Sequence, residues 1–540
     1  MDQNIMAQNK SQPRVERPPV LDAEEFRRNV VAAYNNGTAE LRLPADRDVA
    51  RSLIPAGTGA FRDFSYLAQE IPRFIADNCV GCMDCVTQCP DTAILAKVIS
   101  EPVLEDQLAL EEDPQQRERL RGHFTKTSKY YEVPKRRGGA GGIFSIFIDP
   151  TKCKGCAECV TACGTHDALQ MIQKDRDVVP SYQQDFTFFN DLPDTPKEFI
   201  NEKSLVDMML ASDALLYTGG AGSCMGCGEA TALRMLMAAT GFVYGQQSFG
   251  FVAATGCNTV YGSTYPYNPF TVPWTNSLFE NAPTDAMGVR LRWDQQGLED
   301  KRLWVIGGDG AMYDIGFQSL SRMLISGMNI KVIVLDTQVY SNTGGQTSMA
   351  SFIGQEAKMS VHGGVIKGKV ERRKELGLIA LMHPEVFVAQ VICSNPNHFY
   401  KAVMAANEFP GPAVVICYTT CQPEHGVGDD MAGAQAKLAC DSRAFPIYIY
   451  DPRKGDTIQE RLDLGGNPVR DQDWFTNPKT GEPLTFIDFA RSEGRFAKQF
   501  DQDGKPSPAL LIACQERLDN WHVLQELAGI RKPVVKERAR

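Results

Sequence analysis

The chain has 540 residues, 43% hydrophobic and 23% charged, a composition typical of a soluble globular protein with about three or four domains. Its net charge of −10 argues against nucleic acid as the main partner, because phosphate backbones bind basic surfaces. No apolar stretch has the roughly 18 residues of a membrane span, and the polar N-terminal segment lacks a secretory core. We therefore expect a cytoplasmic protein without a membrane span.

Composition and spacing divide the chain into five segments. Residues 1–70 are predicted to be an N-terminal arm, and residues 71–180 hold two cysteine runs. Residues 181–205, rich in Asp, Pro and aromatics, are predicted to be a linker. Residues 206–450 alternate β-branched runs with helical periodicity, and the more polar residues 451–540 are predicted to be a C-terminal extension.

The two cysteine runs share the spacing C-x2-C-x2-C-x3-C. Sixteen cysteines in a cytoplasmic chain are better explained by metal ligation than by disulfides. This spacing is typical of 4Fe–4S clusters, and in two-cluster ferredoxins the fourth cysteine of each run ligates the other cluster. Zinc is the alternative, but zinc sites usually pair two C-x2-C arms. The predicted ligand sets are Cys79, Cys82, Cys85 and Cys163, and Cys153, Cys156, Cys159 and Cys89.

A basic stretch separates the two runs. It is a candidate docking site for an acidic ferredoxin, although a solvated loop or a contact with a partner subunit is the preferred interpretation. Its cations are Lys126, Lys129, Lys135, Arg136 and Arg137.

Four short apolar runs between residues 302 and 418 predict buried parallel strands. They are RLWVIGGDG, IKVIVLDT, VFVAQVI and PAVVICY. Between the first two lies IGFQSLSRMLISG, whose apolar spacing suits a crossover helix that ends at a glycine. Strand–helix–strand units predict a doubly wound α/β domain.

Two of these strands end in residues suited to a diphosphate and its metal ion. A carboxylate follows the first strand, between glycines that allow close backbone approach, and a threonine follows the next. Ligands of α/β folds bind at these carboxyl ends. A backbone carbonyl two residues later and a nearby asparagine complete the predicted site. The candidates are Gly308, Asp309, Gly310, Thr337, Val339 and Asn342.

Four further cysteines are dispersed: Cys224 and Cys227 in GSCMGCGE, Cys257 in AATGCNT, and Cys421 in YTTC. Each alone is more typical of a buried structural thiol. The single C-x2-C is a half-site that suits zinc, a cluster or redox chemistry.

Taken in order, these motifs resemble the thiamine diphosphate domain of pyruvate:ferredoxin oxidoreductase. The resemblance rests on GSCMGCGE, AATGCNTVYG, GDGAMYDIG, DTQVYSNTGGQTS and YTTCQPEHG. The double cysteine run resembles that enzyme's ferredoxin domain, and RSEGRFAKQFD its C-terminal segment. The resemblance covers residues 55–450 and, more loosely, the chain to 540. It implies a small α+β two-cluster ferredoxin-like domain before an α/β thiamine-diphosphate-binding domain with a doubly wound parallel sheet.

The resemblance also implies a reaction and its cofactors. Pyruvate would be oxidatively decarboxylated with coenzyme A to acetyl-CoA and CO2, and the reverse carboxylation stays open. Three 4Fe–4S clusters, thiamine diphosphate and Mg²⁺ would take part, with ferredoxin or flavodoxin as electron acceptor. Cys224, Cys227, Cys257 and Cys421 would hold the third cluster, beside the thiamine.

Two further residues are assigned to the thiamine site. Asn342 is the candidate catalytic residue, and Glu229 is a candidate cofactor contact with a role at a helix start as the alternative. Cys393, Cys417, Cys440 and Cys514 are expected to be core thiols.

Part of such an enzyme has no counterpart in this sequence. No segment resembles the domain for the thiamine pyrimidine ring or a coenzyme A-binding region. We therefore expect a larger companion subunit that supplies the pyrimidine, 2-oxoacid and coenzyme A sites, in a dimer of heterodimers. The alternatives are the same chemistry on 2-oxoglutarate, a branched 2-oxoacid or an aryl-pyruvate, and a ferredoxin-type electron-transfer module without thiamine catalysis.

Overall fold

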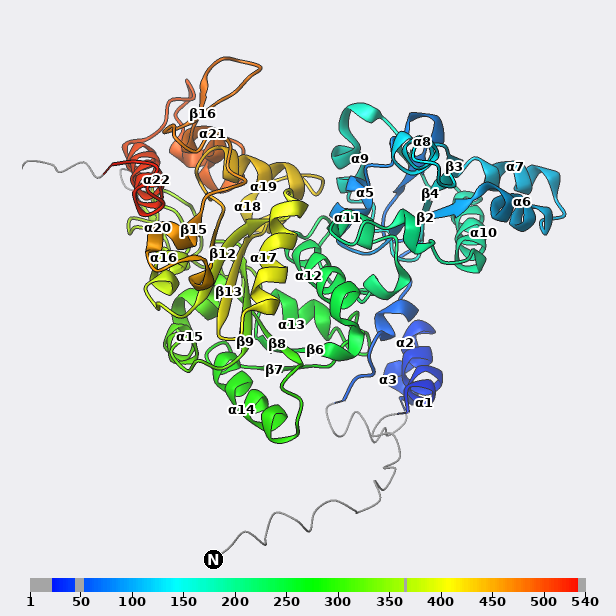
Figure 1. The fold of residues 1–540 in the computed structure, drawn as a ribbon, viewed down its shortest axis with the longest axis horizontal. Helices are drawn as coiled ribbons and strands as arrows, with labels where there is room; N and C mark the ends of the chain where they lie inside the picture. The colour runs from blue at the N-terminus through cyan, green and yellow to red at the C-terminus, as the bar shows by residue number, and fades with distance from the viewer. Residues whose placement is uncertain (1–21, 44–52, 364–366, 533–540) are drawn as a thin grey trace, which may run out of the picture.

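The computed structural model describes residues 22–43, 53–363 and 367–532. A large α/β domain lies beside a smaller cysteine-rich unit, and short N-terminal helices lie below that unit in Figure 1. In the described part of the chain, no helix has the length and apolar character needed to cross a bilayer.

The α/β domain is built on an eight-stranded sheet of order β15-β14-β12-β13-β9-β8-β6-β7. Its six parallel strands are β6 (Phe249–Ala254), β7 (Trp274–Ser277), β8 (Arg302–Gly308), β9 (Ile330–Asp336), β12 (Phe387–Ile392) and β13 (Ala413–Tyr418). Two antiparallel strands, β14 (Tyr448–Tyr450) and β15 (Leu462–Asp463), close one edge. The predicted parallel sheet is confirmed, and the crossover helix is α15 (Phe317–Leu324).

Helices cover both faces of this sheet. Alternate residues of a strand point to opposite faces, so that Trp304 and Ile306 contribute to one core and Leu303 and Val305 to the other. The first core includes α12 (Gly228–Tyr244) and α17 (Pro396–Glu408). The second includes α14 (Ala282–Gln295), α15 and α16 (Leu376–Leu381). The domain is therefore doubly wound.

The α/β domain does not end at residue 450. β15 extends its sheet, and α21 (Phe486–Arg491) and α22 (Pro508–Leu527) pack into its second core. Phe486, Phe489, Phe496 and Trp521 are fully buried there. Because these aromatics are spaced among many polar residues, the composition of the segment hides its contribution to the core.

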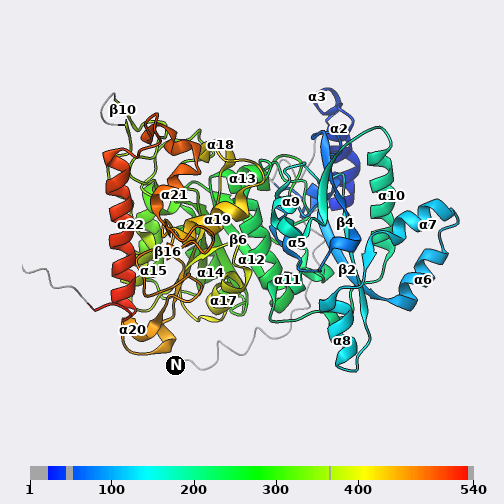
Figure 2. The ribbon, with the colours of Figure 1, turned by 90° about the horizontal axis from the view of Figure 1, so that it is seen from above.

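The cysteine-rich unit has two antiparallel sheets. In one, β1 (Glu70–Phe74) pairs with β5 (Leu169–Gln173). In the other, β4 (Gly142–Ile148) pairs with both β2 (Ile94–Ser100) and β3 (Phe124–Thr125). Two short helices, α5 (Asp84–Gln88) and α9 (Glu158–Cys163), carry cysteines of the first and second run. The region between β2 and β4 forms α6 (Glu101–Ala109), α7 (Pro114–Arg121) and α8 (Val133–Arg136), which project from the unit (Figure 2).

Two predicted irregular segments contain helices. The N-terminal arm forms α1 (Ala23–Phe26), α2 (Ala32–Asn35) and α3 (Ala39–Arg42), and Phe26 packs with Tyr267 of the α/β domain. α10 (Val178–Asp191) occupies the first half of the predicted linker and buries Phe189 against β4. Most of the aromatic residues that suggested a linker therefore belong to this helix.

The two units contact each other through their cysteine-bearing helices. α5 packs against α12, and α9 packs against α19 (Ala432–Asp441). Glu158 accepts hydrogen bonds from the backbone N–H groups of Ala432 (2.9 Å) and Gly433 (2.8 Å), at the start of α19. The Thr161 hydroxyl donates to Asp430 at 2.8 Å.

Candidate functional site

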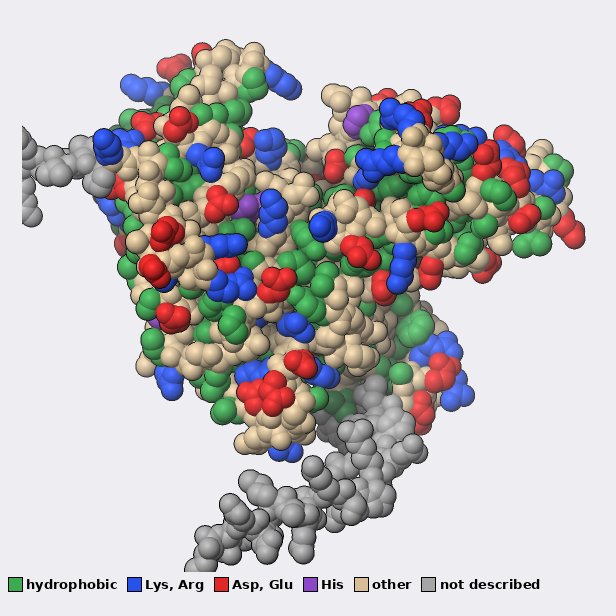
Figure 3. Space-filling view, in the orientation of Figure 1, with side chains coloured by type: hydrophobic (Ala, Val, Ile, Leu, Met, Phe, Trp, Pro, Cys, Tyr) green, Lys and Arg blue, Asp and Glu red, His purple; other side chains and the backbone are tan. Residues whose placement is uncertain are grey.

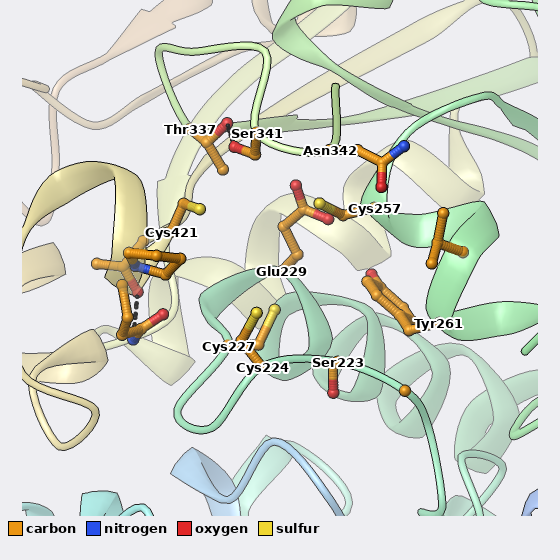
Figure 4. A pocket seen from close by; sticks show the side chains of 15 residues that line it. Ser223, Cys224, Cys227, Glu229, Cys257, Tyr261, Thr337, Ser341, Asn342 and Cys421 are labelled. Carbon is orange, nitrogen blue, oxygen red and sulfur yellow. Dashed lines mark hydrogen bonds between the residues drawn. The ribbon is translucent and has the colours of Figure 1, made fainter. Parts of the chain in front are cut away.

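Two adjoining cavities lie at the carboxyl ends of the parallel strands β6, β8, β9 and β13. The larger has a volume of about 200 Å³ and is shown in Figure 4. The smaller is lined by the Gly308–Asp309–Gly310 turn and the loop after β9. Side chains common to both walls are Glu229, Cys257, Thr337, Ser341 and Asn342. This edge of the sheet is where α/β folds bind ligands.

The smaller cavity brings the predicted metal-binding residues together. The Thr337 hydroxyl lies 3.0 Å from both the Asp309 carboxylate and the Val339 carbonyl, and 2.8 Å from the Ser341 hydroxyl. Asp309 is 1% exposed, and burial, followed by the charge of Asp336, raises its pKa to about 7. A carboxylate, a hydroxyl and a carbonyl are the hard oxygen donors that Mg²⁺ prefers, so this donor set fits the ion.

The loop after β9 is fixed by residues far along the chain. His425 Nε2 lies 2.7 Å from the Thr337 carbonyl, and Arg495 donates to the same carbonyl at 3.3 Å. Arg495 also donates to the side chain of Gln338 at 3.0 Å, and Gln338 has a positive φ of 57°. Arg495 lies in the motif RSEGRFAKQFD, so this C-terminal motif supports the turn that carries Thr337.

The Glu229 side chain points into the larger cavity (Figure 4) and lines the smaller one as well. It lies in the first turn of α12, yet its Oε2 has no hydrogen-bond partner within the described residues. Burial, followed by the charge of Asp309, raises its pKa to about 8. The geometry of Glu229 therefore does not support a role in capping the helix. Asn342 is exposed and lines both cavities.

The four dispersed cysteines meet in the larger cavity. Cys224 and Cys227 reach it from the loop before α12, Cys257 from the start of α13 (Cys257–Gly262), and Cys421 from the end of β13 (Figure 4). Gly226 turns the C-x2-C loop with a φ of 68°, and a Cβ there would collide with the Asp429 backbone. Burial raises the pKa of Cys421 to about 11.

The cysteines of the two runs are also grouped crosswise. Cys79, Cys82, Cys85 and Cys163 line one cavity in the smaller unit. In the other group, burial raises the pKa of both Cys153 and Cys156, and the strongest influence of another thiol on each is that of Cys89. Backbone N–H groups donate to the sulfurs of Cys79, Cys89 and Cys163 at 3.3–3.4 Å.

Two of these groups each place four thiols around one cavity. Among the described residues, no three His, Cys, Asp or Glu side chains gather closely enough to hold a single metal ion. Four thiols around a cavity with N–H donors aimed at sulfur are a donor set that fits a cubane cluster.

A buried ion pair connects two of the cysteine groups. Lys154 Nζ lies 2.7 Å from Asp91 and donates to the Ser223 carbonyl at 2.8 Å. Lys154 follows Cys153, Asp91 lies two residues after Cys89, and Ser223 precedes Cys224. This pair therefore ties the second run to the loop of the dispersed set.

Sequence reasoning missed several residues of this region. The Ser348 hydroxyl donates to the second oxygen of Asp309, and the Tyr261 ring lines the larger cavity. Lys154 and Arg234 contribute through contacts between distant segments. Ser348 and Tyr261 had a signal, since they lie within DTQVYSNTGGQTS and AATGCNTVYG.

The basic stretch is partly neutralised within the chain. Lys126 pairs with Glu101 at 2.8 Å, and Lys129 pairs with Asp207 at 2.5 Å. Basic side chains gather over α8, beside acidic ones (Figure 3).

Comparisons with known proteins agree with the composition of the site. Residues 254–417 match the family described as thiamine pyrophosphate enzyme, C-terminal TPP binding domain. The chain is 27% identical to the pyruvate-flavodoxin oxidoreductase of Rhodospirillum rubrum, over 95% of this chain and 46% of that protein. It is 27% identical to the pyruvate:ferredoxin oxidoreductase of Moorella thermoacetica, over 94% of this chain and 46% of that protein.

The chain thus spans less than half the length of these relatives. Among solved structures, a 2-oxoglutarate:ferredoxin oxidoreductase from Magnetococcus marinus matches with a TM-score of 0.33 and 23% identity, covering 37% of this chain and 64% of that one.

Proposed function

We propose that this chain, a homologue of the pyruvate-flavodoxin and pyruvate:ferredoxin oxidoreductases over most of its length, is the part of such an enzyme that holds thiamine diphosphate and conducts electrons. The proposed reaction is the oxidative decarboxylation of pyruvate with coenzyme A to acetyl-CoA and CO2, or its reverse. Ferredoxin or flavodoxin would accept the electrons.

One observation carries this proposal: the oxygen-donor cavity and the four-thiol cavity share a wall. Glu229, Cys257, Thr337, Ser341 and Asn342 face both. A diphosphate-bound cofactor in one cavity would therefore lie next to an electron carrier in the other. An enzyme that removes electrons from its substrate one at a time needs this adjacency.

Each residue of the oxygen-donor cavity has a proposed role. Asp309, Thr337 and Val339 would ligate Mg²⁺, and Asn342 would donate to the diphosphate and orient it. Glu229 has an unpartnered buried oxygen and would hold a proton between the two cavities. When bound, thiamine diphosphate supplies an electron sink for breaking the bond to the 2-oxoacid carboxylate.

The thiol groups would hold three 4Fe–4S clusters in series. Cys224, Cys227, Cys257 and Cys421 form the proximal set. Cys89, Cys153, Cys156 and Cys159 form the medial set, which Lys154 and Asp91 join to the proximal loop. Cys79, Cys82, Cys85 and Cys163 form the distal set, beside the exposed Val80, in a two-cluster ferredoxin-like domain.

A companion subunit is proposed to supply the pyrimidine, 2-oxoacid and coenzyme A sites, in a dimer of heterodimers. The support is that the relatives are more than twice as long as the region they share with this chain. The choice of 2-oxoacid would then depend on the companion.

The test is turnover of the anaerobically purified complex that contains this chain. We expect coenzyme A-dependent reduction of ferredoxin or flavodoxin, with kcat/KM for pyruvate at least roughly tenfold above that for 2-oxoglutarate, branched 2-oxoacids or aryl-pyruvates. A different leading substrate would replace pyruvate in the proposal. Clusters that are reducible without any thiamine-dependent activity would instead favour the electron-transfer module.

A further inference from the structure

Arg234 is a buried cation at the contact between the two units. It lies on α12, two turns after Cys227, and is 3% exposed. Burial lowers its pKa, and the charges of Cys89 and Asp91 are the strongest influences in the opposite direction. A guanidinium stays protonated in proteins, so the side chain is charged.

The Arg234 side chain donates hydrogen bonds to the backbone at the end of α5. It donates to the carbonyls of Val86 at 2.6 Å and Thr87 at 3.2 Å, and to the Thr92 hydroxyl at 3.1 Å. The last carbonyls of a helix lack partners within it, and a cation is favourable there. Arg234 therefore fixes residues 86–92 relative to α12.

The segment that Arg234 holds adjoins or contains cysteines of two thiol groups. Cys85, on α5, belongs to the distal set, and Cys89, which follows α5, belongs to the medial set. Cys227, at the start of α12, belongs to the proximal set. One helix thus connects the proximal set to the segment on which the other two sets meet.

These contacts leave one nitrogen of the Arg234 guanidinium, its second terminal nitrogen, without a hydrogen bond among the described residues. Cys89, Asp91 and Cys85 are among the groups that oppose the lowering of the Arg234 pKa by burial. A 4Fe–4S cluster with four thiolates is anionic and gains one more negative charge on reduction. A buried cation beside it stabilises the reduced form more than the oxidised form.

We propose that Arg234 is a positioning residue that raises the reduction potential of the medial cluster, so that it accepts an electron from the proximal cluster. This inference rests on the proposed function. In the electron transfer concerned, the medial cluster would gain the one electron that the proximal cluster would lose, with no bond formed or broken. The electron donor and the electron acceptor of this step would thus both lie within this chain.

The experiment is an EPR-monitored redox titration of the anaerobically purified protein, with iron content measured in parallel. Arg234→Gln keeps amide donors for the carbonyls but removes the charge, whereas Arg234→Lys keeps the charge. We expect Arg234→Gln to lower the reduced-to-oxidised ratio of the medial cluster at least tenfold at fixed potential, which is about 59 mV for one electron. Arg234→Lys should shift the ratio by less than about threefold.

Arg443→Gln is the matched control. Arg443 is also fully buried and donates to backbone carbonyls, of Pro468 and Val469, but none of the proposed ligands is among its contacts. The reduction potential of the medial cluster in Arg443→Gln should equal that in the wild type. An unchanged potential in iron-replete Arg234→Gln, or equal shifts in the Gln and Lys variants, would overturn the inference.

Two further outcomes are assigned in advance. If Arg234→Gln loses iron, the test rests on iron-replete Arg234→Lys. A tenfold change in the reduced-to-oxidised ratio of its medial cluster would contradict the electrostatic role, because this variant keeps the charge. Wild-type protein without three reducible clusters would refute the proposed function itself.

Discussion

The Thr337 hydroxyl donates a hydrogen bond to the Asp309 carboxylate over 3.0 Å, although 28 positions separate the two residues. β8 and β9 are parallel neighbours in register, with Gly308 opposite Leu335, so their carboxyl ends meet at one edge. The register of these two strands thereby brings together the proposed metal-binding pair.

Removing the Asp309 carboxylate should abolish tight Mg²⁺-dependent binding of thiamine diphosphate. Asp309→Asn keeps the volume but loses the charge that balances the cation, and we expect affinity to fall at least about 100-fold, or about 2.7 kcal/mol. Calorimetric titration with Mg²⁺ and thiamine diphosphate measures this loss. Asp441→Asn, at a partly buried carboxylate paired with Lys437, is the control. Equal affinity in the two variants would contradict the assignment of Asp309.

Ser348 should contribute less than Asp309 but measurably. Its hydroxyl donates to Asp309, and a hydrogen bond to a charged group contributes about 1.5–3 kcal/mol. Ser348→Ala should therefore weaken Mg²⁺–thiamine diphosphate binding about tenfold or more in the same titration. Ser360→Ala provides a comparison, because the Ser360 hydroxyl bonds only locally, to Ala357. An unaltered affinity in Ser348→Ala would show that Asp309 needs no second support.

The sequence predicts these elements because their signals are local. Continuous burial along β8 and β9 follows from their continuous β-branched runs, and the crosswise grouping of the two cysteine runs follows from their spacing. Ser348 and Arg234 escape prediction because their partners lie 39 and about 142–148 positions away. The role of Arg495 escapes for the same reason, since it reaches Thr337 across 158 positions. Long-range contacts depend on packing, which spacing does not encode.

The iron content should separate the three thiol sets. Three cubane clusters require about twelve irons per chain, and Cys257→Ala should lose about four, because three thiolates hold a cubane poorly. Cys440→Ala is the matched control, since Cys440 is buried and its nearest polar contact is Asn467. Iron analysis with EPR spectra of the reduced protein measures the loss. A variant that keeps twelve irons would remove Cys257 from the proximal set.

Stability should depend on pH through Lys331. Burial lowers the pKa of Lys331 to about 7, from 10.5 in the unfolded chain, so between these values the unfolded state binds more protons. Burying Lys331 therefore destabilises the folded state most below pH 7, and this destabilisation decreases as the pH rises. The apparent free energy of unfolding should increase by about 2 kcal/mol between pH 7 and 9.

Anaerobic denaturation of Lys331→Met at pH 7, 8 and 9 tests this dependence. The increase should be lost in Lys331→Met and kept in Lys437→Met, where the lysine side chain is 68% exposed. Parallel pH dependences in wild type and Lys331→Met would contradict the role of Lys331.

The last prediction concerns the companion subunit. Thiamine catalysis requires a carboxylate at the pyrimidine ring and a clamp for the substrate carboxylate. The residues gathered here instead suit the diphosphate and its metal ion on one side, and thiols on the other. We expect the isolated chain to bind iron and to bind thiamine diphosphate weakly, yet to show no pyruvate-dependent reduction of ferredoxin.

Activity should appear when the companion is added, and it should saturate at one companion per chain because each cofactor would lie at one subunit interface. The assay follows ferredoxin reduction during titration of the companion, with Asp309→Asn chain as the control that assembles without turning over. Assembly in that control separates a failure of binding from a failure of catalysis. Robust turnover of pyruvate and coenzyme A by the isolated chain would instead require that the pyrimidine carboxylate belong to this chain.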